Sequence, residues 1–179
     1  MRHPQQSWKA FADSKIMPAE DLEGHLRTFR TEGHTVATLN GSFDLLHAGH
    51  LYFIYEAAKT ADILVVALNT DASVKRYKSP SRPIIPLRER MEMVAALSLV
   101  DFVTWFDEDD PRAIIRLLRP DVHVNGAEYG ENCIEAATVR QCGGRLHLVD
   151  RIPGLATSQI LATIRNLCDE YGPQPTKVL

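Results

Sequence analysis

The chain has 179 residues, of which 45% are hydrophobic and 24% are charged, as expected for a folded domain with a substantial core. Its 20 Lys and Arg residues against 23 Asp and Glu residues give a net charge of −3, which argues against non-specific nucleic-acid binding. The three cysteines lack a CxxC spacing and predict reduced thiols rather than a disulfide framework or a zinc site. We find no secretory signal and no apolar run long enough to span a membrane, so we expect a cytoplasmic protein without a membrane partner.

Residues 1–33 form a predicted helical extension at the N-terminus. The first 14 residues have no clear periodicity and predict no element. A helix is expected from about Pro18, because proline suits the first helical turn and acidic residues follow it. Its apolar side chains have i, i+4, i+7 spacing: Leu22, Leu26 and Phe29. This helix is either an accessory element packed on the domain or an arm that binds a partner.

Residues 34–171 alternate between short apolar runs and longer amphipathic runs. The apolar runs predict strands at residues 35–39, 63–68, 102–106, 122–125 and 146–149. Helices are predicted at residues 51–59, 87–99, 111–118, 132–142 and 157–171. Strands separated by helices indicate right-handed βαβ units. We therefore predict an α/β fold, a Rossmann-like doubly wound five-stranded parallel sheet in a three-layer α/β/α arrangement. Residues 172–179 are expected to be a flexible tail.

In such sheets the ligand binds at the carboxyl ends of the strands, where the strand order reverses. This rule predicts that four loops meet in space: residues 40–50, 69–82, 125–130 and 150–158. These loops contain most of the unusual polar residues of the chain.

The first of these loops contains two histidines, His47 and His50, at the start of a predicted helix. Residues three apart share a helix face, so both imidazoles should point the same way, beside free N–H groups at a positive helix end. Such a corner suits a polyphosphate, and Gly49 leaves space for it to approach the backbone. The alternative is a metal site, although zinc sites usually need three or four protein ligands.

The second loop is basic, with Lys75, Arg76, Lys78 and Arg82. It is either a solvated surface or part of the ligand site, and its position after a buried strand favours the site. Arg90 lies with Arg88 at the start of the next helix, where a cation opposes the helix dipole. This placement hints that one of the two arginines meets an anion.

The last two loops are ambiguous. Residues 125–130 are either an ordinary turn or part of the ligand site. Thr157 or Ser158 is a predicted N-cap of the final helix, which is a sufficient structural reason for a hydroxyl there. The functional alternative is a second helix N-terminus aimed at phosphates, with Arg151 beside it. His123 and His147 lie inside predicted strands and are interpreted as structural histidines.

The segment from Gly41 to His50 resembles the G-x-F-D-x-x-H-x-G-H signature of the cytidylyltransferase-like nucleotidyltransferases, and the resemblance extends over residues 35–165. Residues 69–78, 81–84, 86–90 and 125–129 resemble one branch, the heptose 1-phosphate adenylyltransferase domain of ADP-heptose synthase. The resemblance implies an enzyme of carbohydrate metabolism that condenses ATP with heptose 1-phosphate, a step toward a lipopolysaccharide precursor. Mg²⁺ would accompany ATP, and the products would be ADP-heptose and pyrophosphate. It also suggests a homodimer.

The same resemblance implies roles for individual residues. His47, His50 and Lys75 would be catalytic, with both imidazoles holding the triphosphate and stabilising the transition state. Asp44 would lie near the nucleotide or bind Mg²⁺. Substrate phosphate would be bound by Lys75, Lys78, Arg82 and Arg90. The implied nucleotide-binding set is Asn40, Gly41, Ser42, Phe43, Asp44, His47, Gly49, His50, Asn125, Gly126, Arg151, Thr157 and Ser158.

Four positions depart from the pattern of the heptose branch. Asn125 replaces a lysine, Glu128 an aspartate, Ser79 a glycine and Ala156 a serine. Three alternatives therefore stay open. The first is a CTP-dependent cytidylyltransferase acting on glycerol 3-phosphate or a related phosphorylated alcohol. The second is a non-catalytic nucleotide-binding module on the same fold. The third is a metal-dependent hydrolase that uses the histidine pair.

Overall fold

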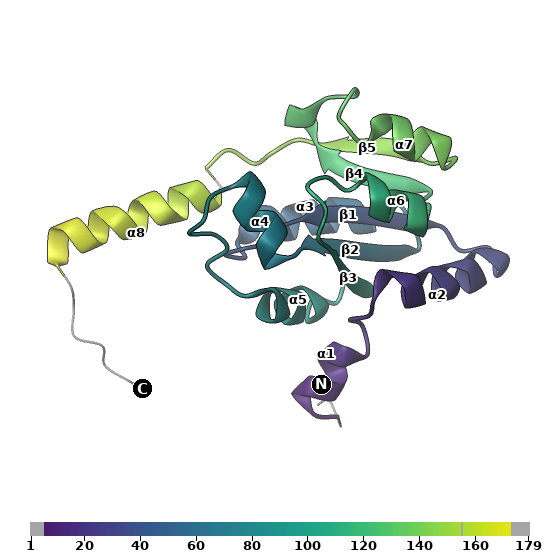
Figure 1. Cartoon of the computed structure of the whole chain (residues 1–179), viewed down its shortest axis with the longest axis horizontal. Helices are drawn as coiled ribbons and strands as arrows, with labels where there is room; N and C mark the ends of the chain where they lie inside the picture. Colours follow the sequence, from purple (N-terminus) through teal and green to yellow (C-terminus); the bar gives the residue numbers. More distant parts are fainter. Residues whose placement is uncertain (1–5, 155, 173–179) are drawn as a thin grey trace.

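The computed structural model describes residues 6–154 and 156–172. At its centre is a five-stranded parallel sheet with the order β3-β2-β1-β4-β5 (Figure 1). The strands are β1 Val36–Gly41, β2 Ile63–Asn69, β3 Phe102–Phe106, β4 Val122–Gly126 and β5 Arg145–Val149. The chain builds outward from β1 to β3 and then crosses to the other side of β1, so the order reverses between β1 and β4. The predicted doubly wound sheet is confirmed, and every predicted strand lies within two residues of its observed bounds.

The helices are α1 Trp8–Asp13, α2 Ala19–Thr31, α3 Ala48–Ala58, α4 Asp71–Tyr77, α5 Leu87–Ala95, α6 Arg112–Leu118, α7 Ala136–Gln141 and α8 Thr157–Tyr171, with a 3₁₀ turn at Ala127–Tyr129. Two of them were not predicted. No element was expected where α1 forms, and α4 lies in the segment interpreted as a basic loop. Thr70 is the N-cap of α4, and its hydroxyl accepts the Ser73 N–H at 3.1 Å.

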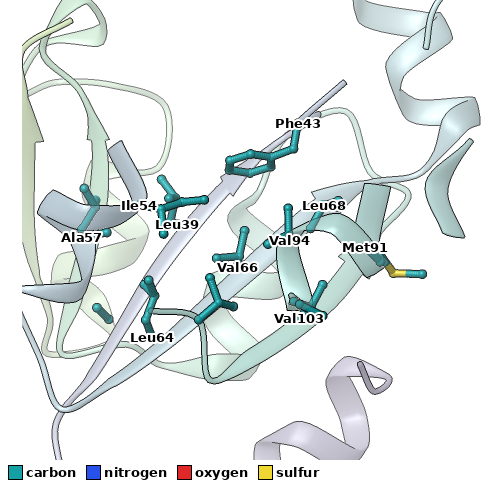
Figure 2. Packing of buried hydrophobic residues seen from close by; sticks show 14 of the residues in the cluster. Leu39, Phe43, Ile54, Ala57, Leu64, Val66, Leu68, Met91, Val94 and Val103 are labelled. Atoms are coloured by element: carbon teal, nitrogen blue, oxygen red, sulfur yellow. The ribbon is translucent and has the colours of Figure 1, made fainter. Parts of the chain in front are cut away.

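One face of the sheet is covered by α3 and α5. Side chains of β2 alternate between the two faces, and the side chains of Leu64, Val66 and Leu68 point to this one. Figure 2 shows Ile54 of α3 and Val94 of α5 packed over this surface. Each fully buried aliphatic side chain stabilises the fold by roughly 1.5–3 kcal/mol.

The other face is covered by α2 and α6. Leu22 and Leu26 of α2 are fully buried against Val65 of β2, beside Ile114 and Leu118 of α6. Helices on both faces confirm the predicted three-layer arrangement. The helix of the N-terminal extension is thus packed on the domain, as the first of the two sequence interpretations expected.

The final helix, α8, leaves the sheet and extends away from the body of the domain (Figure 1). Its first turn lies at the carboxyl edge of the sheet, whereas Ile164 and Leu167 are each 48% exposed. Most of the expected flexible tail, from residue 173 onward, lies outside the described residues. Within the residues that the structure describes, no helix combines the length and apolarity needed to cross a bilayer.

Candidate active site

A cavity of about 890 Å³ lies at the carboxyl ends of the strands. This is a typical volume for the binding site of a small ligand. The four loops predicted to meet do meet here, represented by Ser42, Lys78, Asn125 and Arg151. The loop after β3 also contributes, through Asp110 and its neighbours, which the sequence interpretation did not include. Other lining residues named from the sequence are Asn40, Gly41, Phe43, His47, Gly49, His50, Arg82, Gly126, Thr157 and Ser158.

The turn between β1 and α3 is conformationally strained at Phe43, whose φ of 45° is rare for a residue with a side chain. The Phe43 ring is nonetheless buried, and its centroid lies 5.3 Å from that of His50. Burial of the ring therefore supports a backbone conformation that is unfavourable by itself. The strained residue lies between the strand and the histidine pair, at the wall of the cavity.

His47 and His50 stack with their ring centroids 3.9 Å apart and share one face, as predicted. His47 is the N-cap of α3, and its Nδ1 accepts the Gly49 N–H at 3.1 Å. Nδ1 of His50 accepts the His47 N–H at 3.4 Å. Because each Nδ1 is an acceptor, each neutral ring carries its proton on Nε2. The pair thus keeps two Nε2–H donors that the cap does not use.

Both imidazoles are neutral at neutral pH. Burial, together with the nearby His47, Lys78 and Arg151, lowers the pKa of His50 to about 4. Burial also lowers the pKa of His47. An anion entering the cavity would oppose both effects, so the pair is suited to receive negative charge.

Lys78 extends its ammonium into the cavity, where Nζ donates to Ser42 Oγ at 2.8 Å. Burial, followed by repulsion from Arg82, lowers the pKa of Lys78. Lys75 on α4, in contrast, does not line the cavity. The catalytic and substrate-binding roles expected of Lys75 are therefore not supported. Lys78 follows the last residue of α4, where the chain turns toward β1.

Asp44 is fully buried and serves the structure of the loop. Its carboxylate accepts Arg82 Nε at 2.6 Å and the backbone N–H groups of Ile84 and Ile85 at 3.0 Å. Burial alone would raise the pKa of Asp44, but the two backbone N–H groups and the guanidinium outweigh it and lower the pKa. Both oxygens are held by the chain itself, so the expectation of a metal ligand at Asp44 is replaced by a structural role.

Arg82 lines the same cavity and has a donor to spare. Its Nε is bonded to Asp44, whereas its buried Nη2 has no hydrogen-bond partner among the described residues. A buried, unpaired guanidinium nitrogen is unfavourable, and an anionic ligand would satisfy it.

Arg90 is fully buried and is used by the chain itself. Its guanidinium donates to the backbone oxygens of Ser42, Ile85 and Asn69, and to Asp71 Oδ1 at 2.7 Å. These contacts hold three loops together at the floor of the site. The sequence expectation that Arg90 contacts substrate is not supported, because the Asp71 carboxylate compensates its charge and three carbonyl oxygens accept its other donors.

The loop after β5 brings Arg151 to the cavity, with Nε 2.6 Å from Glu128 Oε1. The N-cap of α8 is Ala156, not Thr157 or Ser158 as expected. The Ala156 N–H donates to Gln159 Oε1 at 3.2 Å, so a glutamine in the first turn, and not a hydroxyl at the N-cap, makes the side-chain contact at this helix start. Thr157 and Ser158 still line the cavity in the first turn of this helix.

The wall at the end of β4 contains a residue that sequence reasoning missed, Glu135. It is buried and lines the cavity, and Oε1 accepts Asn125 Nδ2 at 2.5 Å. In the sequence, an acid within a predicted amphipathic helix indicates a solvated surface position. Only the folded structure brings it beside Asn125.

A second cavity, of about 760 Å³, lies between α2, α6 and the ends of β2 and β3. Its cation is Arg76, with Nε 2.6 Å from Asp109 Oδ1 and a further contact to the Asp107 carboxylate. This arginine is neutralised within the chain, so the cavity has no excess positive charge for a phosphate. Of the basic residues in the second loop, only Lys78 and Arg82 belong to the first cavity.

In residues 6–154 and 156–172, no group of three or more His, Cys, Asp or Glu side chains is placed to hold a metal ion. The histidine pair therefore lacks the further protein ligands that a zinc site requires. Any Mg²⁺ at this site would depend mainly on phosphate oxygens and water, which is a common way for this ion to bind.

The chain is similar in sequence to known proteins. The bifunctional protein HldE of Syntrophotalea carbinolica is 44% identical over 160 residues, covering 89% of this chain and 32% of the relative. HldE of Methylobacillus flagellatus is 40% identical over 158 residues, covering 88% and 32%. The chain thus spans about a third of the length of these curated relatives.

Two solved structures share the fold. A lipopolysaccharide core biosynthesis protein from Thermoplasma volcanium has a TM-score of 0.54 and 24% identity, covering 66% of this chain and 97% of that one. The pantoate-beta-alanine ligase of Francisella tularensis, solved with β,γ-ATP and β-alanine, has a TM-score of 0.54 and 14% identity, covering 92% and 82%. The cytidylyltransferase-like family matches residues 38–164, from the first strand to the middle of α8. The chain therefore belongs to the cytidylyltransferase-like family of nucleotidyltransferases.

Proposed function

We propose that the chain transfers the adenylyl group of ATP to a sugar 1-phosphate, with heptose 1-phosphate as the preferred acceptor. The observation that carries this proposal is the stacked pair of neutral imidazoles, His47 and His50, beside Lys78 and Arg82. This arrangement suits a polyphosphate and a second phosphate in one cavity. The relatives named HldE, and the segments resembling the heptose branch, favour this nucleotide and this acceptor.

In the proposed reaction, an oxygen of the acceptor phosphate attacks the α-phosphorus of ATP in line. The new oxygen–phosphorus bond forms as the bond to pyrophosphate breaks, so no protein nucleophile is needed. Nε2–H groups of His47 and His50 would stabilise the charge that develops on the phosphate oxygens. The remaining contribution is positioning of the two substrates.

We assign the cations of the cavity to two different substrates. Lys78 and the unpaired Nη2 of Arg82 would bind the acceptor phosphate. Arg151 and the first turn of α8, with Thr157 and Ser158, would bind the β- and γ-phosphates. Mg²⁺, bound by phosphate oxygens, would neutralise part of their charge.

The test is pyrophosphate release measured across ATP, CTP, GTP and UTP with a panel of phosphorylated acceptors. We expect turnover with ATP and heptose 1-phosphate. Turnover with CTP and glycerol 3-phosphate alone would instead support a cytidylyltransferase, which the description of the matched family keeps as the second candidate. Nucleotide binding without pyrophosphate release from any pair would indicate a non-catalytic module.

A further inference from the structure

The cavity has two chemically different walls. On the side of β1 and β2 the wall carries the imidazoles and cations that suit phosphates. At the end of β4 the wall carries an amide, a thiol and a carboxylate, from Asn125, Cys133 and Glu135, with Tyr129 and Ile134 beside them. Glu128 of the same wall is paired with Arg151. A buried carboxylate repels phosphate, so this second wall suits the part of a nucleotide that carries no negative charge.

Glu135 is held in place by Asn125. Only 5% of Glu135 is exposed, and its Oε1 accepts Asn125 Nδ2 at 2.5 Å. The other end of the amide is fixed, because Asn125 Oδ1 accepts the Gly126 N–H at 2.9 Å. An ionised carboxylate offers about four acceptor positions, and Asn125 uses one of them. The side chain is therefore oriented and has acceptor capacity left.

His123 lies behind Glu135 and does not neutralise it. It is 1% exposed, with Nδ1 2.7 Å from Thr38 Oγ1. Its buried Nε2 has no hydrogen-bond partner in the described part of the chain and lies 3.9 Å from Glu135 Oε1, too far for a hydrogen bond. Burial lowers the pKa of His123 to about 4, so the ring is neutral at neutral pH. The carboxylate therefore keeps acceptor positions that Asn125 does not use and that a ligand in the cavity could reach.

We infer that Glu135 reads the base of the nucleotide by accepting a hydrogen bond from its exocyclic amino group, with Asn125 as the residue that positions the carboxylate. The inference rests on the proposed function for the presence of a nucleotide. Adenine and cytosine both present an amino donor at the edge where uracil, like thymine, presents a carbonyl oxygen. Glu135 thus selects ATP or CTP against UTP, and other contacts separate the first two.

The experiment measures equilibrium binding to the full chain by calorimetry, using ligands that differ by one group. ATP is compared with purine riboside 5′-triphosphate, which lacks the 6-amino group, and CTP is compared with UTP. A third comparison, ATP with 2′-deoxy-ATP, tests a ribose hydroxyl as the donor. Inorganic tripolyphosphate measures the phosphate wall alone.

We expect wild type to bind at least one amino-bearing nucleotide about tenfold more tightly than its amino-free partner, the usual scale for one base contact. Glu135→Met removes the acceptor and should reduce that ratio to about twofold, leaving tripolyphosphate affinity unchanged. Glu135→Gln keeps an acceptor oxygen and should restore part of the ratio. Thermal unfolding of both variants reports whether the fold is intact.

Three outcomes would overturn the assignment of Glu135. The first is that wild type binds ATP and purine riboside 5′-triphosphate equally tightly and also binds CTP and UTP equally tightly. The second is equal loss of ATP and tripolyphosphate affinity in Glu135→Met and Glu135→Gln, which would indicate a purely structural role. The third is that wild type binds 2′-deoxy-ATP more weakly than ATP and that Glu135→Met removes this difference in affinity. That result would make a ribose hydroxyl the donor. Base discrimination that depends on Glu135, without pyrophosphate release from any acceptor, would support the assignment while the proposed function fails.

Discussion

Arg82 and Asp44 form a buried ion pair, with Nε 2.6 Å from Oδ2, that joins the loop before α5 to the turn between β1 and α3. The Asp44 side chain is completely covered and Arg82 is mostly covered, at 16% exposure. Because Asp44 also accepts the backbone N–H groups of Ile84 and Ile85, it fixes the position of the loop from which Arg82 reaches the cavity. Asp44, although it lies within the family signature, therefore has a structural role, because it holds the loop of Arg82 in place.

Replacement of Asp44 by Asn should destabilise the fold. The amide cannot hold the guanidinium charge, and breaking one member of a buried pair usually costs about 3–5 kcal/mol. Urea unfolding should show a loss on this scale. Asp109→Asn, at an ion pair whose carboxylate is 71% exposed, is the matched control and should change stability by less than about 1 kcal/mol. An unchanged stability of Asp44→Asn together with a raised Mg²⁺ requirement would contradict the structural role.

Lys78 and Lys75 give a second matched pair. Lys78→Ala removes an ammonium from the cavity and should lower kcat/KM for pyrophosphate release by roughly 10–100-fold, as expected for a charged group lost from a phosphate site. Lys75→Ala, at an exposed position of α4, should stay within about twofold of wild type. Steady-state kinetics with both substrates varied would separate the two variants. A larger loss of kcat/KM in Lys75→Ala than in Lys78→Ala would contradict the assignment of Lys78, and not Lys75, to the cavity.

The stability of the domain should fall as the pH falls from about 6.5 toward 4. His123 has a pKa of about 4 in the folded chain against 6.5 ordinarily, so within this window the unfolded chain binds more protons than the folded one. The contribution is fully present above pH 6.5 and is lost as the pH approaches 4, on the order of 2–3 kcal/mol. His50, with the same pKa, acts in the same direction.

The measurement is the free energy of unfolding in urea at pH 7.5 and at pH 5. His123→Gln keeps a partner for Thr38 but removes the titrating group, so it should lose part of the pH dependence. An identical difference between the two pH values in wild type and in His123→Gln would show that His123 does not titrate in this way.

Hydrophobic patterns that are local in sequence were sufficient to predict the strands and the edge at which the loops meet. The run from Ile63 to Leu68 is a clear example, since its length and apolarity specify a strand buried on both faces. The helices α1 and α4 were missed because α1 lies in a segment without clear apolar periodicity and α4 lies in a run of basic and polar residues.

The side-chain roles that sequence reasoning misassigned depend on tertiary contacts. Arg90 opposes the dipole of α5 whether it meets a ligand or three carbonyl groups, and only the folded loops decide between them. Asn125 and Glu135 are ten residues apart, on β4 and at the start of α7, and no periodicity joins them. The histidine pair could be placed because its geometry arises within a single helical turn.

The most direct test of the account is the rate of pyrophosphate release by His47→Ala and His50→Ala, at saturating nucleotide and acceptor. If their Nε2–H groups stabilise the transition state, each variant should lower kcat by about 10²–10³, typical for loss of one such donor, with little change in acceptor KM. Unchanged kcat in both variants, in protein that unfolds cooperatively like wild type, would contradict the central claim that this pair acts on the triphosphate.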